Sequence, residues 1–143
     1  MATIRPPGSG PHFEAICRDY AITADPGVFG GLPGEVGSGV VPDPANRTQI
    51  EVDVVVLAPA EPGRPRKILS LGEAKWDRVM DLRHVERLRR ARELLAVKGF
   101  DTRDTVLNCY SGAGFSRELP AGQSHDIRLV GLDQLYADQR DLT

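Results

Sequence analysis

Three ionisable residues near the middle of the chain have the types and spacing of a metal-assisted hydrolytic site. Asp53 lies within the β-branched run Gln49–Ala58. Glu73 and Lys75 lie two residues apart at the end of the apolar run Lys67–Trp76. Carboxylates hold Mg²⁺ together with water and phosphate oxygens, and the metal lowers the pKa of a bound water. An ammonium group stabilises developing negative charge, so the set suits phosphodiester hydrolysis.

The same spacing also fits an ordinary strand surface. Acidic and basic residues commonly pair on strands, so Glu73 and Lys75 would form a surface pair unrelated to Asp53. Alternation with period two places Asp53 on the same face as Val55. It places Glu73 on the same face as Leu71, at the end of an apolar strand.

Pairing of the two strands would join these residues into one site. Because consecutive strands often pair, the two runs would bring Asp53 and Glu73 within reach of one metal ion, beside Lys75.

Apolar spacing predicts the elements that position these residues. Of the 26 Gly and Pro residues, 19 lie in the first 65 positions, so the front of the chain is broken into short pieces. The predicted order is helix, Gly/Pro-rich passage, two strands, long helix, two strands and short helix, which makes an α/β domain with a mixed central sheet flanked by helices. The predicted elements are a helix over Phe13–Tyr20, strands over Gln49–Ala58 and Lys67–Trp76, a helix from the N-cap Asp81 to about Lys98, strands over Thr105–Tyr110 and Ile127–Val130, and a helix over Leu132–Asp138.

Composition excludes several classes of protein. The chain has 143 residues with a formal charge of −2, which predicts one domain over 11–143 after an arm or linker over 1–10. No apolar run approaches the roughly 20 residues of a membrane span. The N-terminus lacks the apolar core of a secretory signal, so we expect a cytoplasmic protein without a membrane partner. Cys17 and Cys109 show neither metal-ligand nor disulfide-framework spacing.

The motif Gly72–Trp76 (GEAKW), twenty residues after Glu51–Asp53 (EVD), resembles the PD-(D/E)xK nuclease superfamily. It resembles in particular the nuclease-like domain at the C-terminus of archaeal-type ATPases and their actinobacterial relatives. Gly10–Glu14 (GPHFE) is similar to the family's G-x-x-F-E opening, and Asp126–Gly131 (DIRLVG) is similar to a late strand. The resemblance therefore spans most of residues 10–138.

The resemblance implies a restriction-endonuclease-like core and roles for particular residues. Asp53, Glu73 and the backbone carbonyl of Ala74 would bind Mg²⁺ or Mn²⁺. Lys75 would be the catalytic lysine, and Glu14 would complete the site from the first helix.

Three alternatives stay open at this site. Glu14 would otherwise pair with Arg18 at i,i+4. Glu51 is either an auxiliary ligand or an exposed strand-end residue. Pro42-Asp43 also resembles the family's PD, but its setting has the composition of a turn. A metal ligand needs a rigid strand, so we prefer Asp53 to Asp43.

A basic segment supplies candidate nucleic-acid contacts. The segment from Arg64 to Arg92 contains ten basic and four acidic residues. Within it, Arg83, Arg87 and Arg90 lie on one stripe of the predicted long helix. Such a stripe gives salt-sensitive phosphate binding, although i,i+4 pairs from Glu86 to Arg90 and from Arg89 to Glu93 need no ligand. Trp76 would either stack on a base or cover the core. The Gly-rich segment Ser111–Ser116 lacks the pattern of a phosphate-binding loop.

The expected function is that of a Mg²⁺-dependent deoxyribonuclease domain, an endonuclease acting on DNA, with structured or branched DNA among its substrates. The resemblance also implies a homodimer. The alternative is a catalytically silent module that dimerises or docks with an ATPase domain in cis or in trans, because fold alone does not determine function.

Overall fold

Six strands of the described residues form one mixed sheet. The structure, a computed structural model, describes residues 3–5, 12–119 and 125–141. Neighbouring strands from β1 to β4 are antiparallel, whereas β4, β5 and β6 run parallel. The strands follow the sheet order β1 (Thr3–Arg5), β2 (Glu35–Asp43), β3 (Thr48–Leu57), β4 (Ile68–Lys75), β5 (Val106–Ser111) and β6 (Ile127–Val130).

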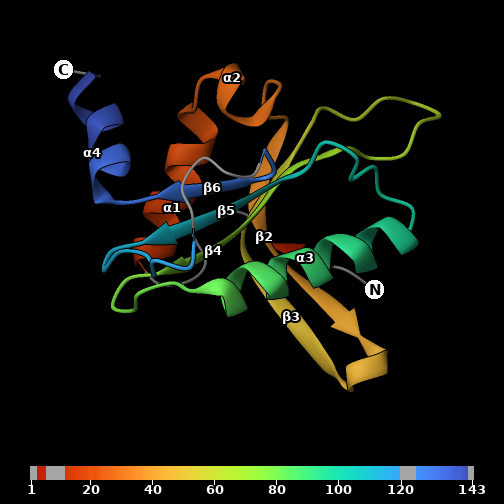
Figure 1. Cartoon of the computed structure of the whole chain (residues 1–143). Coiled ribbons are helices and arrows are strands. Elements are labelled where there is room, and N and C mark those ends of the chain that lie inside the picture. The colour runs from red at the N-terminus through yellow and green to blue at the C-terminus, as the bar shows by residue number, and fades with distance from the viewer. Residues whose placement is uncertain (1–2, 6–11, 120–124, 142–143) are drawn as a thin grey trace.

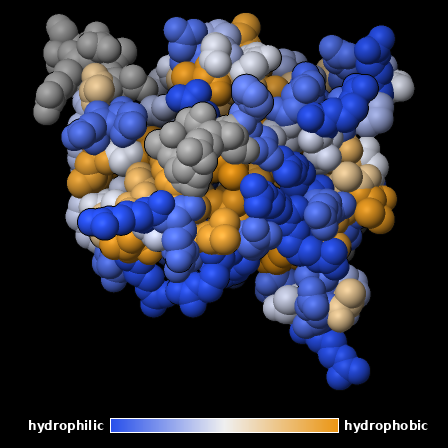
Figure 2. Space-filling view, in the orientation of Figure 1, coloured by the Kyte–Doolittle hydropathy of each residue, from blue (hydrophilic) through white to orange (hydrophobic). Residues whose placement is uncertain are grey.

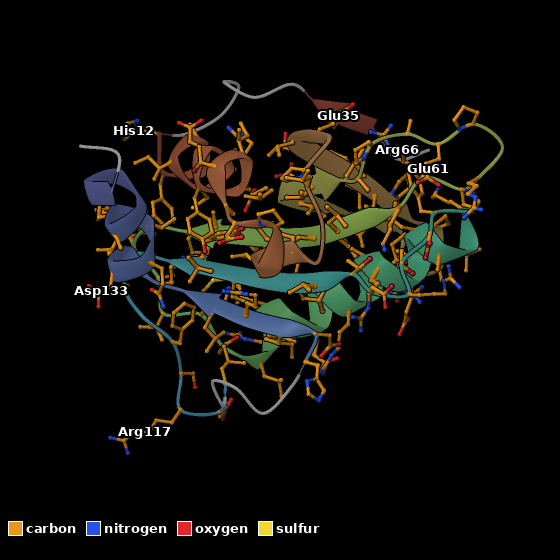
Figure 3. All side chains as sticks on the ribbon, turned by 90° about the horizontal axis from the view of Figure 1, so that it is seen from above. His12, Glu35, Glu61, Arg66, Arg117 and Asp133 are labelled. Carbon is orange, nitrogen blue, oxygen red and sulfur yellow. The ribbon has the colours of Figure 1, made fainter. Side chains whose placement is uncertain are left out.

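Helices cover both faces of this sheet. The chain crosses from β4 to its parallel neighbour β5 through the long helix α3, as the sequence predicts. Figure 3 shows α1 on one side of the sheet and α3 on the other, and Figure 1 shows the same layers from the front. Among the described residues, no helix combines the length and apolar character needed to cross a membrane. The helices are α1 (His12–Thr23), α2 (Pro26–Phe29), the 3-10 turn η1 (Pro44–Asn46), α3 (Leu82–Val97) and α4 (Leu132–Asp141).

The predicted α/β class with a mixed, helix-flanked sheet is confirmed. Every predicted element is present in the predicted order, and α2, β2 and η1 are additional elements in the passage predicted only as Gly/Pro-rich. Asp81 caps α3, where its side chain accepts a hydrogen bond from the N–H of Arg83. β2 was not predicted, because its sequence EVGSGVVPD contains Gly and Pro, which are rare in strands. Thr3–Arg5 pair with β2 in the region of the predicted arm, and residues 1–2 and 6–10 of that arm lie outside the described residues.

A bulge in β3 decides the direction of Asp53. Gly37 pairs with Val55 and Gly39 with Val52, so Ser38 alone lies opposite two residues of β3, Asp53 and Val54. Val52 and Val55 therefore both pack on the α3 side of the sheet, and strict alternation does not run through Asp53. The predicted shared face of Asp53 and Val55 is wrong for this reason.

A second register shift lies between β3 and β4. Leu69 packs on the α1 side and Leu71 on the α3 side, so the period-two rule fails here as well. The register between the two strands ends at the pair Val54–Gly72. Beyond that pair β4 continues beside β5 alone as far as Lys75. The sheet therefore opens between β3 and β4 at the residues of the candidate site.

Candidate active site

Asp53 bridges the opening between β3 and β4. Its Oδ2 accepts a hydrogen bond from the backbone N–H of Ala74 at 2.8 Å. The Nη1 of Arg18, whose residue is only 1% exposed, donates to the backbone carbonyl of Asp53 at 3.0 Å. The carboxylate thus takes the place of a backbone acceptor where the two strands part. Asp53 is held by contacts to α1 and to β4, next to Glu73 and Lys75.

Glu73 is a buried carboxylate on the other side of this opening, with only 4% of its surface exposed. Its Oε1 lies 3.7 Å from Nζ of Lys75 and 3.9 Å from Nη1 of Arg87 on α3. Burial raises the pKa of Glu73, and the negative charge of Asp53 adds to this, while Arg87, His84 and Lys75 oppose it. Glu73 therefore lies among cations and within the field of a second carboxylate.

Glu14 reaches the same site from the first turn of α1. Its pKa is raised to about 7, chiefly by burial and further by a side-chain hydrogen bond with Asp53 and by the charge of Asp53. The charges of Arg18 and Lys75 lower it. Glu14 thus lies close to Asp53, and it also lies in the field of Arg18, the residue with which it would alternatively pair.

Residues from both faces of the sheet meet at this opening. Asp53 interacts electrostatically with Glu14 and Cys17 on α1, whereas Glu73 interacts with groups on α3. The charge of Lys75 acts on both Glu14 and Glu73, so its ammonium group influences both sets. The side chain of Lys75 remains 35% exposed, which leaves it accessible to a ligand from solvent.

The donor set suits a hard cation. Asp53, Glu73 and the carbonyl of Ala74 supply oxygen atoms, the ligands that Mg²⁺ takes beside water and phosphate oxygens. Close carboxylates repel one another, and a bound divalent cation would relieve that repulsion. Within the part of the chain that the structure describes, no three or more His, Cys, Asp or Glu side chains are grouped to hold a metal ion. A metal here would therefore depend on the backbone carbonyl, water and substrate for its remaining ligands.

Asp43, the alternative to Asp53, makes a different set of contacts. Its carboxylate accepts hydrogen bonds from Nη2 and Nε of Arg90 at 3.0 and 3.2 Å and from Nδ2 of Asn46 at 2.9 Å. The hydrogen bond with Arg90 is the main cause that lowers the pKa of Asp43. Asp43 ties the end of β2 to α3. Glu51, the other auxiliary candidate, is exposed on β3 opposite Val40.

Each arginine of the predicted basic stripe contacts a carboxylate. Nη2 of Arg83 lies 2.9 Å from Asp81, Arg87 lies beside Glu73, and Arg90 lies beside Asp43. The i,i+4 pairs that the sequence suggested are replaced by i,i+3 pairs, which join Arg89 to Glu86 and Arg90 to Glu93. The stripe is thus partly neutralised, although Figure 2 shows hydrophilic side chains over α3 and the tip of the β2–β3 hairpin.

Trp76 follows Lys75 and remains 56% exposed. Its ring lies 5.3 Å from that of Phe13 on α1, centroid to centroid. One part of the indole therefore covers the core, and another part stays open to solvent beside the candidate site. Both interpretations of this residue are compatible with that position.

The Gly-rich loop after β5 is tied to the loop after β4. Oγ of Ser111 donates to the carbonyl of Arg78 at 2.9 Å and accepts from the N–H groups of Ala113 and Gly114. The N–H of Gly112 donates to the carbonyl of Lys75 at 3.0 Å. These bonds hold the segment as a turn that supports the end of β4.

His84 belongs to the site but was not assigned to it from the sequence. Its Nδ1 accepts a hydrogen bond from the N–H of Asp81 at 3.0 Å, which completes a capping box at the start of α3. In its protonated form, in which Nδ1 cannot accept that bond, the imidazole would lower the pKa of Glu73. The available signal was its position three residues after the N-cap, which predicts the capping contact but not the proximity to Glu73.

Comparisons with models of protein families, with curated proteins and with solved structures gave no match for this chain. The interpretation of the site therefore depends on its geometry and on the resemblance of its motifs.

Proposed function

We propose that this chain is a metal-dependent DNA endonuclease domain with a restriction-endonuclease-like core, related to the PD-(D/E)xK nucleases. The observation that carries the proposal is the contact of Asp53 with the N–H of Ala74, directly beside Glu73 and Lys75. It brings together an acid from one strand and an acid–lysine pair from the next, at the point where the strands part. The antiparallel β3–β4 pair and the α3 crossover to β5 are compatible with such a core.

The chain's residues suggest a division of labour in hydrolysis. Asp53, Glu73 and the carbonyl of Ala74 would hold Mg²⁺ or Mn²⁺, which supplies an acidified water and stabilises charge on the phosphate. Lys75, partly exposed, would orient that water and offset the charge that develops on the phosphate oxygens. Glu14 would orient Asp53 through their side-chain hydrogen bond.

The surroundings of the site suit a nucleic-acid strand. Trp76 offers an exposed indole next to Lys75, and aromatic rings stack on bases that leave a duplex. We therefore keep structured or branched DNA as the proposed substrate. A homodimer, as in many nucleases that this chain resembles, would place two such sites on one substrate.

A cleavage assay tests the proposal directly. Supercoiled, linear, single-stranded and branched DNA are incubated with wild type at low salt, with Mg²⁺, with Mn²⁺ or with a chelator. We expect metal-dependent cleavage that falls at least about a hundredfold in Lys75→Ala, the scale of losing a positioned catalytic group. Lys67→Ala is the matched control, because Lys67 directly precedes β4 at the end away from Lys75, has a similar exposed fraction (40%) and also lies 3.7 Å from a carboxylate.

A folded wild-type protein that cleaves none of these substrates would overturn the proposed activity. The catalytically silent docking module would then be the preferred function. Its test is co-purification of the wild-type chain with an ATPase domain, which the Lys75→Ala variant should retain.

A further inference from the structure

A basic pocket lies directly beside the candidate site. It has a volume of about 470 Å³ and is lined by Arg78, Val79, Arg83, His84 and Arg87. These residues come from the loop after β4 and from the first turns of α3. Arg87 belongs both to this pocket and to the surroundings of Glu73, at 3.9 Å from its Oε1. The pocket and the candidate site are therefore adjacent and have Arg87 in common.

Three arginines line the pocket, and no carboxylate of the described residues lines it. Outside the lining, Asp81 pairs with Arg83, on which the charge of Glu118 also acts, and Glu73 lies beside Arg87. Within residues 12–119 and 125–137, the side chain of Arg78 makes no ion pair. The N-terminal N–H groups of α3 add little, because the side chain of Asp81 already caps them. The guanidinium groups are thus the source of the pocket's charge, and guanidinium groups are preferred partners of phosphate oxygens.

The backbone that presents these arginines is fixed on both sides. Oγ of Ser111 donates a hydrogen bond to the carbonyl of Arg78. The N–H of Met80 donates to the carbonyl of Gly114, and its carbonyl accepts from the N–H of Ser116. Met80 itself is fully buried. A pocket that is ordered before binding loses less conformational entropy when its ligand arrives.

We propose that this pocket binds a backbone phosphate of the DNA strand next to the phosphate that is cleaved. This inference rests on the proposed function, because it places the pocket's ligand on the same strand. Arg78 and Arg83 hold the phosphate oxygens, and the exposed side chain of Val79 contacts the adjoining sugar. Arg78 and Arg83 are positioning residues in this scheme, since they orient the strand and touch no reacting atom.

Binding in a chelator separates this role from cleavage. The probe is a short fluorescein-labelled DNA duplex, and its anisotropy is measured with wild type, Arg78→Gln and Arg83→Gln over a range of salt concentrations. We expect each variant to bind about threefold to tenfold more weakly and the slope of log affinity against log salt to fall by about 1, as for one lost phosphate contact. Thermal unfolding verifies that each variant remains folded.

Arg103→Gln is the matched control. Arg103 pairs with the carboxylate two residues before it, Asp101, as Arg83 pairs with Asp81. The exposed fractions of the two arginine side chains, 86% and 88%, are almost equal. Arg103 lies near the opposite end of β4, where Lys67 bridges Asp101. The same loss of charge there should leave both affinity and salt slope near those of wild type.

The outcomes distinguish the inference from the function. If wild type cleaves DNA but the Arg78 and Arg83 variants bind like Arg103→Gln, the phosphate pocket is wrong and the nuclease stands. If wild type binds with the expected loss in both variants but never cleaves, the pocket stands as a site for a backbone phosphate and the activity is wrong. If wild type does not bind the duplex even at low salt, both are overturned.

Discussion

The Oδ2 of Asp53 lies 2.8 Å from the backbone nitrogen of Ala74 and accepts its hydrogen bond across the gap between β3 and β4. This contact gives Asp53 two tasks that a substitution can separate. Its Oδ2 accepts the hydrogen bond from the N–H of Ala74 and thereby holds β4 in place. Its negative charge is available to a cation. An asparagine retains the first property and loses the second, which makes it the appropriate replacement.

We predict that Asp53→Asn abolishes metal-dependent cleavage while the protein stays folded. Asp43→Asn should have the opposite effect: it weakens the charged pair with Arg90 and lowers the melting temperature, but it retains cleavage. Cleavage assays and thermal unfolding of both variants provide the measurement. Loss of cleavage in Asp43→Asn but not in Asp53→Asn would identify Asp43, instead of Asp53, as the metal ligand.

Metal should stabilise the folded chain through Asp53 and Glu73. A ligand that binds only the folded state at a hundred times its Kd adds about 2.7 kcal/mol to the free energy of unfolding. We therefore expect Mn²⁺ to raise the melting temperature of wild type at pH 8, and to raise it much less in Asp53→Asn and Glu73→Gln. Glu51→Gln is the control, and loss of the shift there would make Glu51 a ligand.

The stability of the metal-free protein should fall as pH rises through the range set by Glu14. Its pKa is about 7 in the folded state against 4.5 ordinarily, so between these values the folded chain binds more protons than the unfolded chain. The free energy of unfolding therefore decreases with rising pH in that window. We predict that Glu14→Gln melts a few degrees higher than wild type at pH 8 and at nearly the same temperature at pH 5.

Thermal unfolding in a chelator at the two pH values measures this difference. Glu51→Gln again serves as a control, since it removes an exposed carboxylate from the neighbouring strand. Equal melting temperatures of Glu14→Gln and wild type at pH 8 would contradict the close contact of Glu14 with Asp53.

A side chain at Gly72 of the GEAKW motif should destabilise the folded protein. A Cβ at this position would lie 2.6 Å from Cε2 of the buried Tyr110. We predict that Gly72→Ala lowers the free energy of unfolding by about 1–3 kcal/mol, as overpacking of a core does. Urea unfolding measures the change. Gly27→Ala is the control, because a Cβ there meets no atom within 4 Å, and an equal loss in both variants would exclude the ring contact as the cause.

The sequence by itself determined the elements that present the site. The β-branched run of β3 and the helical spacing of α3 are local signals, and so is the cap at Asp81, because each depends on residues close together in the chain. They predicted the strands that present Asp53, Glu73 and Lys75. The neighbouring positions of β3 and β4 followed from their being consecutive.

Only the tertiary structure decided how these residues face one another. The bulge opposite Ser38 directs Asp53, and it depends on the register with β2, a strand whose glycines and proline concealed it. The partners of the arginines on α3 and the approach of Glu14 to Asp53 depend on packing between segments far apart in sequence. Period-two and period-3.6 patterns contain no information on such pairings, because register and long-range contact are properties of the assembled sheet.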